Sequence, residues 1–495
     1  MIRVSTLPLL AYKVGPNLFD LSSNLHHVSM RDQMHRAVVL AEALVAGNQF
    51  EPRGQVLIVG AGVAGVVAGM VLARHNLDVQ IVDNCARAPF GLQRGVTTRY
   101  VGPYMYEWPL TIYGCQKMPP PQSEALFPWT LNKQRVLSVT SNLPVHPDYL
   151  VTGWESELRK AISNSTGRLR LQVGINSAAT NQQVKRWLHA QRNIHKRRHP
   201  RKHGCSVIIS QGKPWGNSHV PFNNLKPQFV LLAAGMGVEK NEVTDVHGSP
   251  LLTGKKFWSN DDIRKPNCGL RTLPRIVVIG GGDGGLQDAL RAATIDDHPL
   301  ITWDRLLAAD LNHVLPKQLA DIQAMESQHL LTAIWTATDS HDSEELHTLD
   351  AAYQLRAKNL AADPQINCAV LNSFRTDVTS VHLCIKGKAF SKTYALNRFL
   401  VHLLEQCSKN VTRKTGTPFF NVVRDVTLTA VNNQGFMKTL TFSNGAVFPA
   451  EVVIIRFGAD RSQIPGQWLG LTVRDTENRR ELAAVPLPLY LPPSR

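Results

Sequence analysis

A glycine-punctuated stretch between two apolar runs constrains the fold of this chain more than any other feature. It reads GQVLIVGAGVAGVVAGMVLARHNLDVQIVDN and covers residues 54–84. Residues 56–59 are apolar and rich in β-branched side chains, as in a buried parallel strand, and a helical pattern follows the glycines. A second apolar run, 79–82, ends at Asp83. Strand, glycine turn, helix and strand in this order predict a Rossmann-type βαβ unit.

The three spaced glycines of this turn have separate physical roles. Gly60 permits the tight turn, Gly62 lets backbone N–H groups approach a pyrophosphate, and Gly65 allows close packing of helix on strand. The helix N-terminus supplies partial positive charge, so phosphate binding requires no basic side chain. Asp83 can accept a hydrogen bond from a ribose 2′-hydroxyl and would repel a 2′-phosphate, which favours FAD or NAD over NADP. The alternative is a purely structural turn, but the complete register favours a nucleotide site.

The fingerprint recurs about 220 residues later, in PRIVVIGGGDGGLQDALRAAT. A strand is expected at 276–279, a helix follows, and the repeated glycines are Gly280, Gly282 and Gly285. Asp283, inside this second turn, would interact favourably with the helix N-terminus but would crowd a pyrophosphate.

The second unit departs from the usual pattern after its first helix. No strand with a terminal acid follows within the usual ~20 residues. Residues 300–367 have helical patterns and are interpreted as an insertion, and the next strand is expected within 377–387. Lys386 and Lys388 near its end, with His382 close in sequence, could contact a 2′-phosphate and favour NADPH over NADH, or be ordinary surface lysines beside an empty pocket.

These patterns predict an α/β fold with two Rossmann-like parallel-sheet dinucleotide-binding domains and a helical insertion in the second. Further strands are expected at 205–210 and from Gln228, and a helix at 148–163. The expected organisation is an N-terminal helical extension (1–54), an FAD-binding Rossmann-like domain with substrate-side loops (55–270), a second NAD(P)-binding-like domain (271–465) and a C-terminal tail packing on the first domain (466–495).

Composition limits the broad class of protein. The chain has 495 residues, of which 43% are hydrophobic and 19% charged, and no run approaches 18 consecutive apolar residues. The N-terminus lacks the pattern of a signal peptide, so a cytoplasmic protein without a membrane span is expected. None of the seven cysteines has close-paired spacing, so neither a dithiol redox centre nor a local metal site is indicated.

The net charge of +16 is concentrated in one place. Residues 185–203, KRWLHAQRNIHKRRHPRKH, contain eight Lys and Arg and no acid. Such a run can bind nucleic acid or another polyanion. It has no interleaved aromatics apart from Trp187 and no nucleic-acid motif, so a solvated surface insertion is the favoured interpretation.

The loop-rich region that follows Asp83 is dense in Pro, Tyr and Trp, as expected for a substrate-facing wall. Arg99, Tyr104 and Tyr106 are the candidates for substrate contact. An arginine can hold a carboxylate through two hydrogen bonds, and a tyrosine can donate another beside it. Anchoring of the loop by its aromatic side chains is the alternative for each of these residues.

Four motifs in order resemble the two-dinucleotide-binding-domain flavoprotein oxidoreductases, the class of glutathione and thioredoxin reductases. They are the first fingerprint with its acid, FVLLAAGMG (229–237), VVIGGGDGG (277–285) and AEVVIIRFGADRS (450–462). GGGDGGLQDA looks especially like the NADPH-domain loop of the thioredoxin reductase branch. The resemblance covers most of residues 55–465.

The resemblance implies roles for individual residues. Gly60, Gly62, Gly65 and Asp83 would bind FAD, Ala234 and Gly235 would lie along it, and Gly280, Gly282 and Gly285 would face a nicotinamide dinucleotide. The redox-active cysteine pair of the disulfide reductases is missing, which removes that activity. The closing Gly-Asp motif that contacts the flavin ribityl or phosphate is not evident in residues 471–495.

The leading hypothesis is an FAD-dependent oxidoreductase. It would transfer hydride between flavin and NAD(P)H or a small organic substrate such as an amine or amino acid. A degenerate dinucleotide-binding regulatory protein without turnover is the second hypothesis. A flavoenzyme acting on nucleic acid through residues 185–203 is the third.

Overall fold

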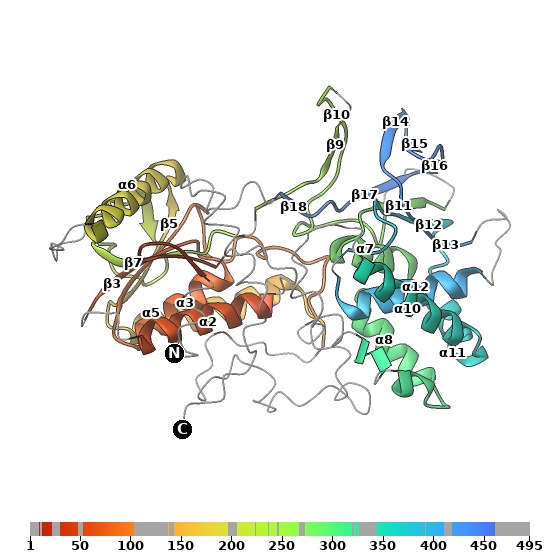
Figure 1. Ribbon diagram of the computed structural model, residues 1–495, viewed down its shortest axis with the longest axis horizontal. Helices are drawn as coiled ribbons and strands as arrows, with labels where there is room; N and C mark the ends of the chain where they lie inside the picture. The colour runs from red at the N-terminus through yellow and green to blue at the C-terminus, as the bar shows by residue number, and fades with distance from the viewer. Residues whose placement is uncertain are drawn as a thin grey trace.

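The structure is a computed structural model, and two lobes, each built around its own sheet, make up its described part (Figure 1). The described residues are 9, 12–21, 30–47, 53–102, 137, 143–196, 205–222, 224–235, 237–244, 247–266, 273–318, 321–322, 324–325, 344–391, 393–409 and 418–460.

The first lobe is built on a seven-stranded sheet of order β1-β2-β7-β3-β4-β5-β6. Strands β2, β7, β3, β4 and β5 are parallel to their neighbours, whereas the outer strands β1 and β6 run antiparallel. The bounds are β1 Lys13–Gly15, β2 Leu18–Asp20, β3 Gln55–Val59, β4 Asp78–Asp83, β5 Leu169–Ile175, β6 Gln211–Pro214 and β7 Pro227–Leu232. The central strands are nearly continuous apolar runs because helices cover both of their faces.

Helices cover the two faces of this sheet unequally. Three helices, α2 (Met30–Ala46), α3 (Val63–Arg74) and α5 (Pro147–Asn164), lie on one face, and α6 (Ser177–Lys196) lies on the other (Figure 1). In α5 the buried residues recur every fourth position, at Leu150, Trp154, Leu158 and Ile162, which gives one apolar stripe. The first sheet therefore has a core on each face.

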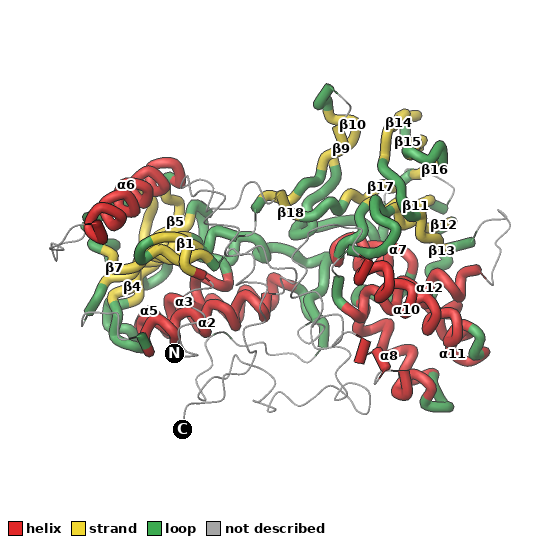
Figure 2. Tube along the Cα trace, viewed as in Figure 1, coloured by secondary structure: helices red, strands yellow, loops and turns green. Residues whose placement is uncertain are grey.

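The second lobe has a parallel four-stranded sheet of order β13-β12-β11-β17. Its strands are β11 (Arg275–Ile279), β12 (Ser380–Cys384), β13 (Phe420–Val423) and β17 (Val452–Ile455). An antiparallel three-stranded sheet, β14 (Leu428–Gln434), β15 (Met437–Phe442) and β16 (Val447–Ala450), packs on one face. Figure 2 shows the helices gathered on the other face.

The helices of the second lobe include the expected insertion. They are α7 (Asp283–Ala293), α8 (Pro299–Ala309), α10 (Glu344–Ala361), α11 (Pro364–Ser373) and α12 (Ala395–Lys409). Helices α8, α10 and α11 fall between α7 and β12, so the next parallel strand begins only at Ser380. The predicted α/β class, with two Rossmann-like sheets and a helical insertion in the second, is confirmed.

Short strands connect the lobes. Strand β8 (Val238–Glu239) pairs antiparallel with β18 (Ala459–Asp460), and β9 (Glu242–Thr244) forms a hairpin with β10 (Pro250–Thr253). The chain thus leaves the first sheet after β7 through β8. Strand β18, which follows β17 of the second lobe, lies beside β8.

Three parts of the first lobe differ from the sequence expectation. Residues 205–210 contain only an isolated bridge at Val207, which pairs with Leu225, and not the expected strand. Strands β1 and β2 extend the sheet from within the N-terminal 54 residues, where only a helix was expected. Residues 185–196 of the basic run lie in helix α6, which was not expected, and residues 197–203 lie outside the described residues.

Among the described residues, no helix is long and apolar enough to cross a membrane.

Candidate dinucleotide-binding site

The first glycine turn is held closely between β3, α3 and β7. Gly60 has φ +112°, a conformation that favours glycine, and a Cβ there would collide with the carbonyl oxygen of Ala233. A Cβ on Gly65 would collide with the carbonyl oxygen of Gly60. Both positions therefore exclude larger side chains for reasons internal to the fold.

Gly62 is different, because no contact among the described residues requires a glycine at that position. Apart from its chain neighbours, no heavy atom of the described residues lies within 4 Å of where its Cβ would be, and its φ of −73° is accessible to any residue. It is the N-cap of α3, no side chain caps it, and the first turn contains no acid. The first-turn N–H groups of a helix have no intrahelical partner, so this end of α3 suits a negatively charged group.

Asp83 ends β4 and reaches back to the turn. Its Oδ2 accepts a hydrogen bond from the Ala61 amide at 2.5 Å, and its Oδ1 accepts one from the Cys85 amide at 2.7 Å. The carboxylate therefore fixes the turn relative to the end of β4. The remaining lone pairs are available to a ribose hydroxyl beside the turn.

Ala234 and Gly235 lie on the other side of the turn, directly after β7. The Ala233 amide donates to the Val59 carbonyl at 2.7 Å, which continues the β3–β7 pairing up to the turn. Both Ala234 and Gly235 are exposed, and Gly235 has φ +95°; apart from its chain neighbours, no heavy atom of the described residues lies within 4 Å of its Cβ position. The structure thus places these two residues with Gly60, Gly62 and Asp83 at the carboxyl ends of neighbouring parallel strands, the usual place for ligands in such sheets.

The second glycine turn repeats the first contact by contact. Gly280 has φ +140° and its Cβ would collide with the Arg456 carbonyl, and a Cβ on Gly285 would collide with the Gly280 carbonyl. Three hydrogen bonds from a backbone amide to a carbonyl oxygen occur at both turns. In the first lobe they are Gly60 to Val82 (2.8 Å), Ala233 to Val59 (2.7 Å) and Phe90 to Ala61 (2.9 Å). Their counterparts in the second lobe are Gly280 to Cys384 (2.9 Å), Arg456 to Ile279 (2.8 Å) and Ser391 to Gly281 (3.0 Å). The last hydrogen bond of each set shows that a loop lies against the turn in both lobes, which the sequence did not indicate.

This correspondence aligns Asp83 of the first lobe with Ile385 of the second. Ile385 is 1% exposed and offers no side-chain acceptor to a ribose. Lys386 and Lys388 follow it and are both exposed. His382, in contrast, is in the middle of β12 against Phe448, with ring centroids 4.7 Å apart, and burial lowers its pKa to about 4. His382 therefore does not belong with the two lysines.

Gly282 and Asp283 distinguish the second turn further. The Cβ position of Gly282 lies 3.5 Å from the Ser391 Oγ, which is ordinary contact. Asp283 Oδ1 accepts hydrogen bonds from the Tyr394 amide (2.7 Å) and the Asn397 Nδ2 (3.1 Å). Burial raises the pKa of Asp283 to about 6, although these two hydrogen bonds act in the opposite direction. Asp283 thus ties the start of α12 to the start of α7.

Arg99 lies in a buried group of charged side chains between the lobes, which we call the interdomain charge cluster. Its guanidinium donates to Asp288 of α7 at 2.8 and 3.0 Å and pairs with Asp261 at 2.9 Å. The cluster consists of Arg99, Asp261, Asp288, Arg291 and Arg456, whose side chains are each at most 4% exposed. These partners, and not an open substrate pocket, surround Arg99. Tyr104 and Tyr106 lie outside the described residues.

The charges of the cluster determine the protonation of Asp288. Burial alone would raise the pKa of this carboxyl, but the positive charges of Arg99 and Arg456 outweigh burial and hold the pKa well below its usual range. Asp288 is therefore ionised at neutral pH. No local sequence pattern indicates this cluster, because Arg99 and Asp288 are 189 positions apart.

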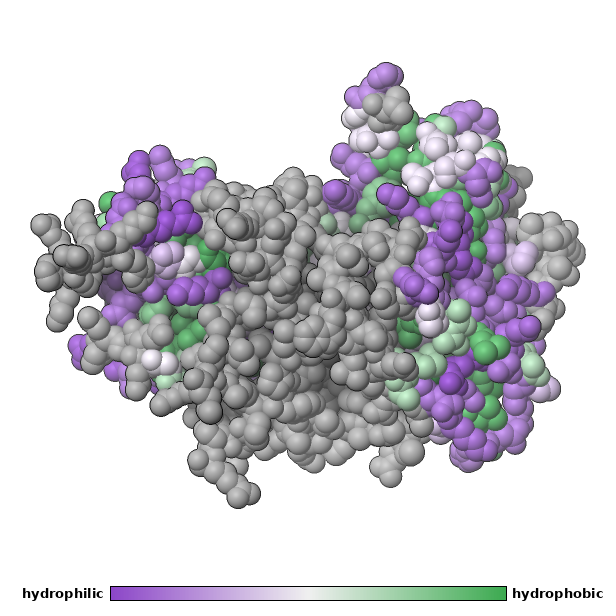
Figure 3. All heavy atoms as spheres, viewed as in Figure 1, coloured by the Kyte–Doolittle hydropathy of each residue, from purple (hydrophilic) through white to green (hydrophobic). Residues whose placement is uncertain are grey.

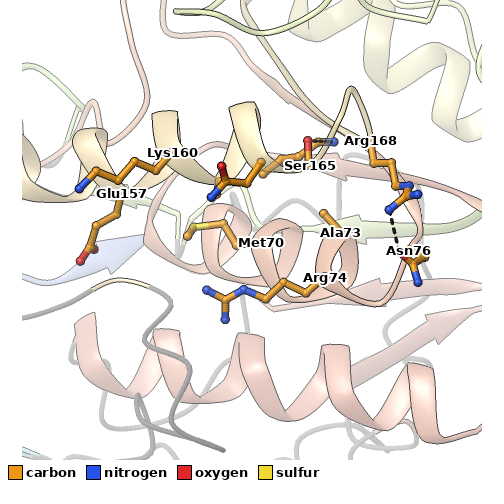
Figure 4. Close-up of a pocket in the computed structure, with 11 residues that line it drawn as sticks. Met70, Ala73, Arg74, Asn76, Glu157, Lys160, Ser165 and Arg168 are labelled. Carbon is orange, nitrogen blue, oxygen red and sulfur yellow. Dashed lines mark hydrogen bonds between the residues drawn. The ribbon is translucent and has the colours of Figure 1, made fainter.

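A separate cavity of about 360 Å³ lies at the other end of α3 (Figure 4). Arg74, Lys160 and Arg168 contribute cationic groups to its lining, and Arg168 donates to the Asn76 side chain at 2.6 Å. Because Arg74 is the last residue of α3 whereas Gly62 precedes its first, the cavity is remote from the glycine turn.

The strand orders and the two matching turns define an α/β chain with two Rossmann-like lobes. No family model and no curated protein matches the sequence. Similar solved structures include a putidaredoxin reductase–putidaredoxin complex (12% identity, TM-score 0.33), Lactococcus lactis thioredoxin reductase (10%, 0.32) and Bacillus cereus bacillithiol disulfide reductase (9%, 0.38).

These matches cover 84%, 82% and 83% of this chain, and 62%, 78% and 81% of the respective other chains. The chain thus spans less than two thirds of the length of the putidaredoxin reductase complex chain. Thioredoxin reductase, the branch that the second glycine loop resembles, is among the similar structures. The fold is assigned from the strand orders and does not depend on these similarities.

Proposed function

We propose that the chain binds FAD at the first glycine turn and is an FAD-dependent oxidoreductase. The observation that carries the proposal is the space at Gly62, where no contact among the described residues explains the glycine but a bound diphosphate would. Asp83 supports it, because its carboxylate lies beside the turn at the end of β4. The residues present therefore fit an adenine dinucleotide.

The residues of the first lobe have distinct tasks in this proposal. The first-turn N–H groups of α3 hold the diphosphate, and Gly62 admits it close to the backbone. Asp83 accepts a hydrogen bond from the adenosine ribose, and Ala234 and Gly235 form the adjoining wall. When bound, the flavin supplies the hydride chemistry, and the protein supplies binding and orientation.

The second turn is proposed to bind NADPH in preference to NADH. Ile385 cannot accept a hydrogen bond from a 2′-hydroxyl, whereas the exposed Lys386 and Lys388 can contact a 2′-phosphate. Reduction of the bound flavin by each nucleotide tests this. We expect a lower KM for NADPH than for NADH in the unmodified chain. In the Lys386→Gln/Lys388→Gln variant the two KM values are expected to be similar. Equal KM values in the unmodified chain would contradict this assignment.

The substrate is proposed to be a small organic molecule such as an amine or amino acid, with Tyr104 and Tyr106 in contact with it. Arg99 was the candidate for holding a substrate carboxylate, but its guanidinium is engaged by Asp261 and Asp288. Under this proposal an anionic substrate would need another cation, and an uncharged amine would need none.

Cofactor release followed by mass spectrometry, together with the visible absorbance of the purified protein, tests the proposed function. We expect flavin absorbance and released FAD. A second candidate is a dinucleotide-binding regulatory protein without turnover. Two features of the second turn favour it: Ile385 offers no acceptor to a ribose, and Asp283 places a carboxyl group in the turn, where it would crowd a pyrophosphate. This candidate predicts released NAD(H) or NADP(H) and no reducible flavin.

A further inference from the structure

Almost all of the excess positive charge of the protein lies in one continuous stretch. Residues 158–238 contain 14 Lys and Arg and no Asp or Glu, whereas the rest of the chain contains 40 Lys and Arg and 38 acidic residues. The basic run at 185–203 is the densest part of this stretch. The remainder of the protein is therefore close to neutral.

The described part of this stretch comprises the end of α5, strands β5 and β6, helix α6 and strand β7. Strand β6 is an edge strand beside β5, whereas β7 lies between β2 and β3, and α6 packs on one face of the sheet on a core that includes residues of β7, β3 and β4. In Figure 1 α6 and β5 lie at the end of the molecule remote from the second lobe, and Figure 3 shows hydrophilic side chains over this end. The excess charge is thus localised on the molecule as well as in the sequence.

Helix α6 presents a fixed cationic face. Val184, Trp187 and Leu188 are at most 2% exposed and pack on the sheet, and the Trp187 indole donates to the Pro227 carbonyl at 3.1 Å. The opposite face carries the exposed residues Lys185, Arg186, His189 and Arg192. Among the described residues none of these three Lys and Arg side chains has an ion-pair partner, so their charges face solvent.

Aromatic side chains are absent from the exposed surface of this edge, as far as the structure describes it. Trp187 and Trp215 are buried, and the guanidinium of Arg170 covers the ring of Phe222 at 3.7 Å. Single-stranded nucleic acids bind largely by stacking bases on exposed aromatic rings. This edge instead suits the phosphates of a base-paired helix, which are bound by charge alone.

We propose that the α6 edge, defined as the exposed face of α6 with β5 and β6, binds double-helical nucleic acid through its phosphates. Lys185 and Arg192 lie seven residues apart, which is about 10 Å along a helix, so α6 can contact successive phosphates. A membrane surface is disfavoured because the apolar face of α6 is already buried in the protein. Contacts to phosphates carry no sequence information, so binding is independent of base sequence.

The basic residues that line the cavity in Figure 4 belong in part to the same stretch, but we do not interpret this cavity as a binding site for a small anion. Helices α3 and α5 both end there, and helix C-termini carry partial negative charge, which basic side chains such as Arg74 offset. Glu157 also lines the cavity.

Fluorescence anisotropy with the full chain tests the proposal, using labelled duplex DNA and duplex RNA of about 20 base pairs between about 50 and 200 mM salt. We expect binding that weakens with salt. The Lys185→Gln/Arg186→Gln/Arg192→Gln variant is expected to bind at least about tenfold more weakly, with a salt slope reduced by about 3.

A matched variant removes the same charge elsewhere. Lys256→Gln/Lys317→Gln/Lys358→Gln alters three exposed lysines outside the α6 edge, and its affinity is expected to change less than about twofold. Equal losses in the two variants, no binding to either duplex, or binding only to anionic lipid vesicles would each overturn the proposal. Flavin content, measured in parallel, is expected to be unchanged in both variants, so the result is independent of the proposed cofactor.

Discussion

At the scale of single residues, Asp83 combines a structural role with its proposed contact to ribose. Its two carboxylate oxygens accept hydrogen bonds from the Ala61 and Cys85 amides, so the turn and the end of β4 are held by one side chain. A residue that both shapes and contacts a binding site should be sensitive to the loss of either oxygen.

Replacing Asp83 with Asn tests this dual role. An amide nitrogen cannot accept a hydrogen bond, so one backbone N–H loses its partner, at a cost of about 1–3 kcal/mol. We expect a lower thermal midpoint and a lower ratio of FAD to protein. Asp78→Asn, at the opposite end of β4, is the control, and equal effects of the two substitutions would contradict the assignment.

The local spacing of residues was enough to locate the turns. Gly60, Gly62, Gly65 and Asp83 were found because the chemistry of a Rossmann turn requires particular residues at short, fixed separations. Arg99 shows the limit of that reasoning, since its partners Asp261 and Asp288 come from the other lobe. A local pattern contains no information on such partners.

At the scale of elements, the distance between helix and strand depends on the third glycine of each fingerprint. We expect Gly65→Ala to lower the thermal midpoint strongly, because the new Cβ would collide with the Gly60 carbonyl and separate α3 from β3. Gly62→Ala should leave the midpoint nearly unchanged. Calorimetry on the two variants checks the difference, and similar midpoints would show that the packing tolerates the added methyl group.

The junction of α7 and α12 should make stability depend on pH through Asp283. Its pKa is raised to about 6, chiefly by burial, so its stabilising contribution is complete below the unfolded-state value of about 4. That contribution is lost as the pH rises through about 6, when this partly buried carboxyl group ionises.

We therefore expect Asp283→Asn, which does not ionise, to gain stability relative to the unmodified protein as the pH rises from about 4 to 7. Thermal midpoints of both proteins across this interval give the comparison. A difference between them that stays constant with pH would rule out ionisation of Asp283 in this range.

Elements were predicted from the sequence wherever their apolar pattern was long and regular. The helical insertion and strands β3, β4 and β11 were of this kind. Strand β5 and helix α6 were not recognised. Both lie in the stretch 158–238, where basic and other polar side chains separate the apolar residues. Strands β1 and β2 have only three residues each, which is too short for a period to be read.

At the scale of the whole molecule, the interdomain charge cluster joins the lobes. Asn260 adds to it, since its side chain accepts hydrogen bonds from the Thr97 and Thr98 amides and donates to the Gly95 carbonyl. Arg99 on the first-lobe loop pairs with Asp288 on α7, and their side chains are 2% and 0% exposed. Loss of Arg99 would remove charged hydrogen bonds to Asp288, although Arg291 and Arg456 would still pair with that carboxylate.

We expect Arg99→Met to destabilise the protein by about 1.5–3 kcal/mol, because it removes charged hydrogen bonds to Asp288 while Arg291 and Arg456 keep that carboxylate paired. Arg94→Met is the matched control on the same loop. The Arg94–Glu155 pair is 32% and 20% exposed, so its loss should cost no more than about 1 kcal/mol. Calorimetric transitions of the two variants give the comparison, and equal destabilisation would mean that Arg99 does not hold the lobes together.

The central claim, that the first turn binds FAD, is tested most directly by the flavin content of Gly62→Val. The free space at the Cβ position of Gly62 and its extended backbone admit a side chain, so the fold should persist, with stability lowered by only about 1 kcal/mol because valine is a poorer N-cap than glycine. The added side chain would occupy the approach to the α3 amides, and we expect the FAD-to-protein ratio to fall at least about tenfold. A folded variant that retains the flavin content of the unmodified protein would contradict the assignment.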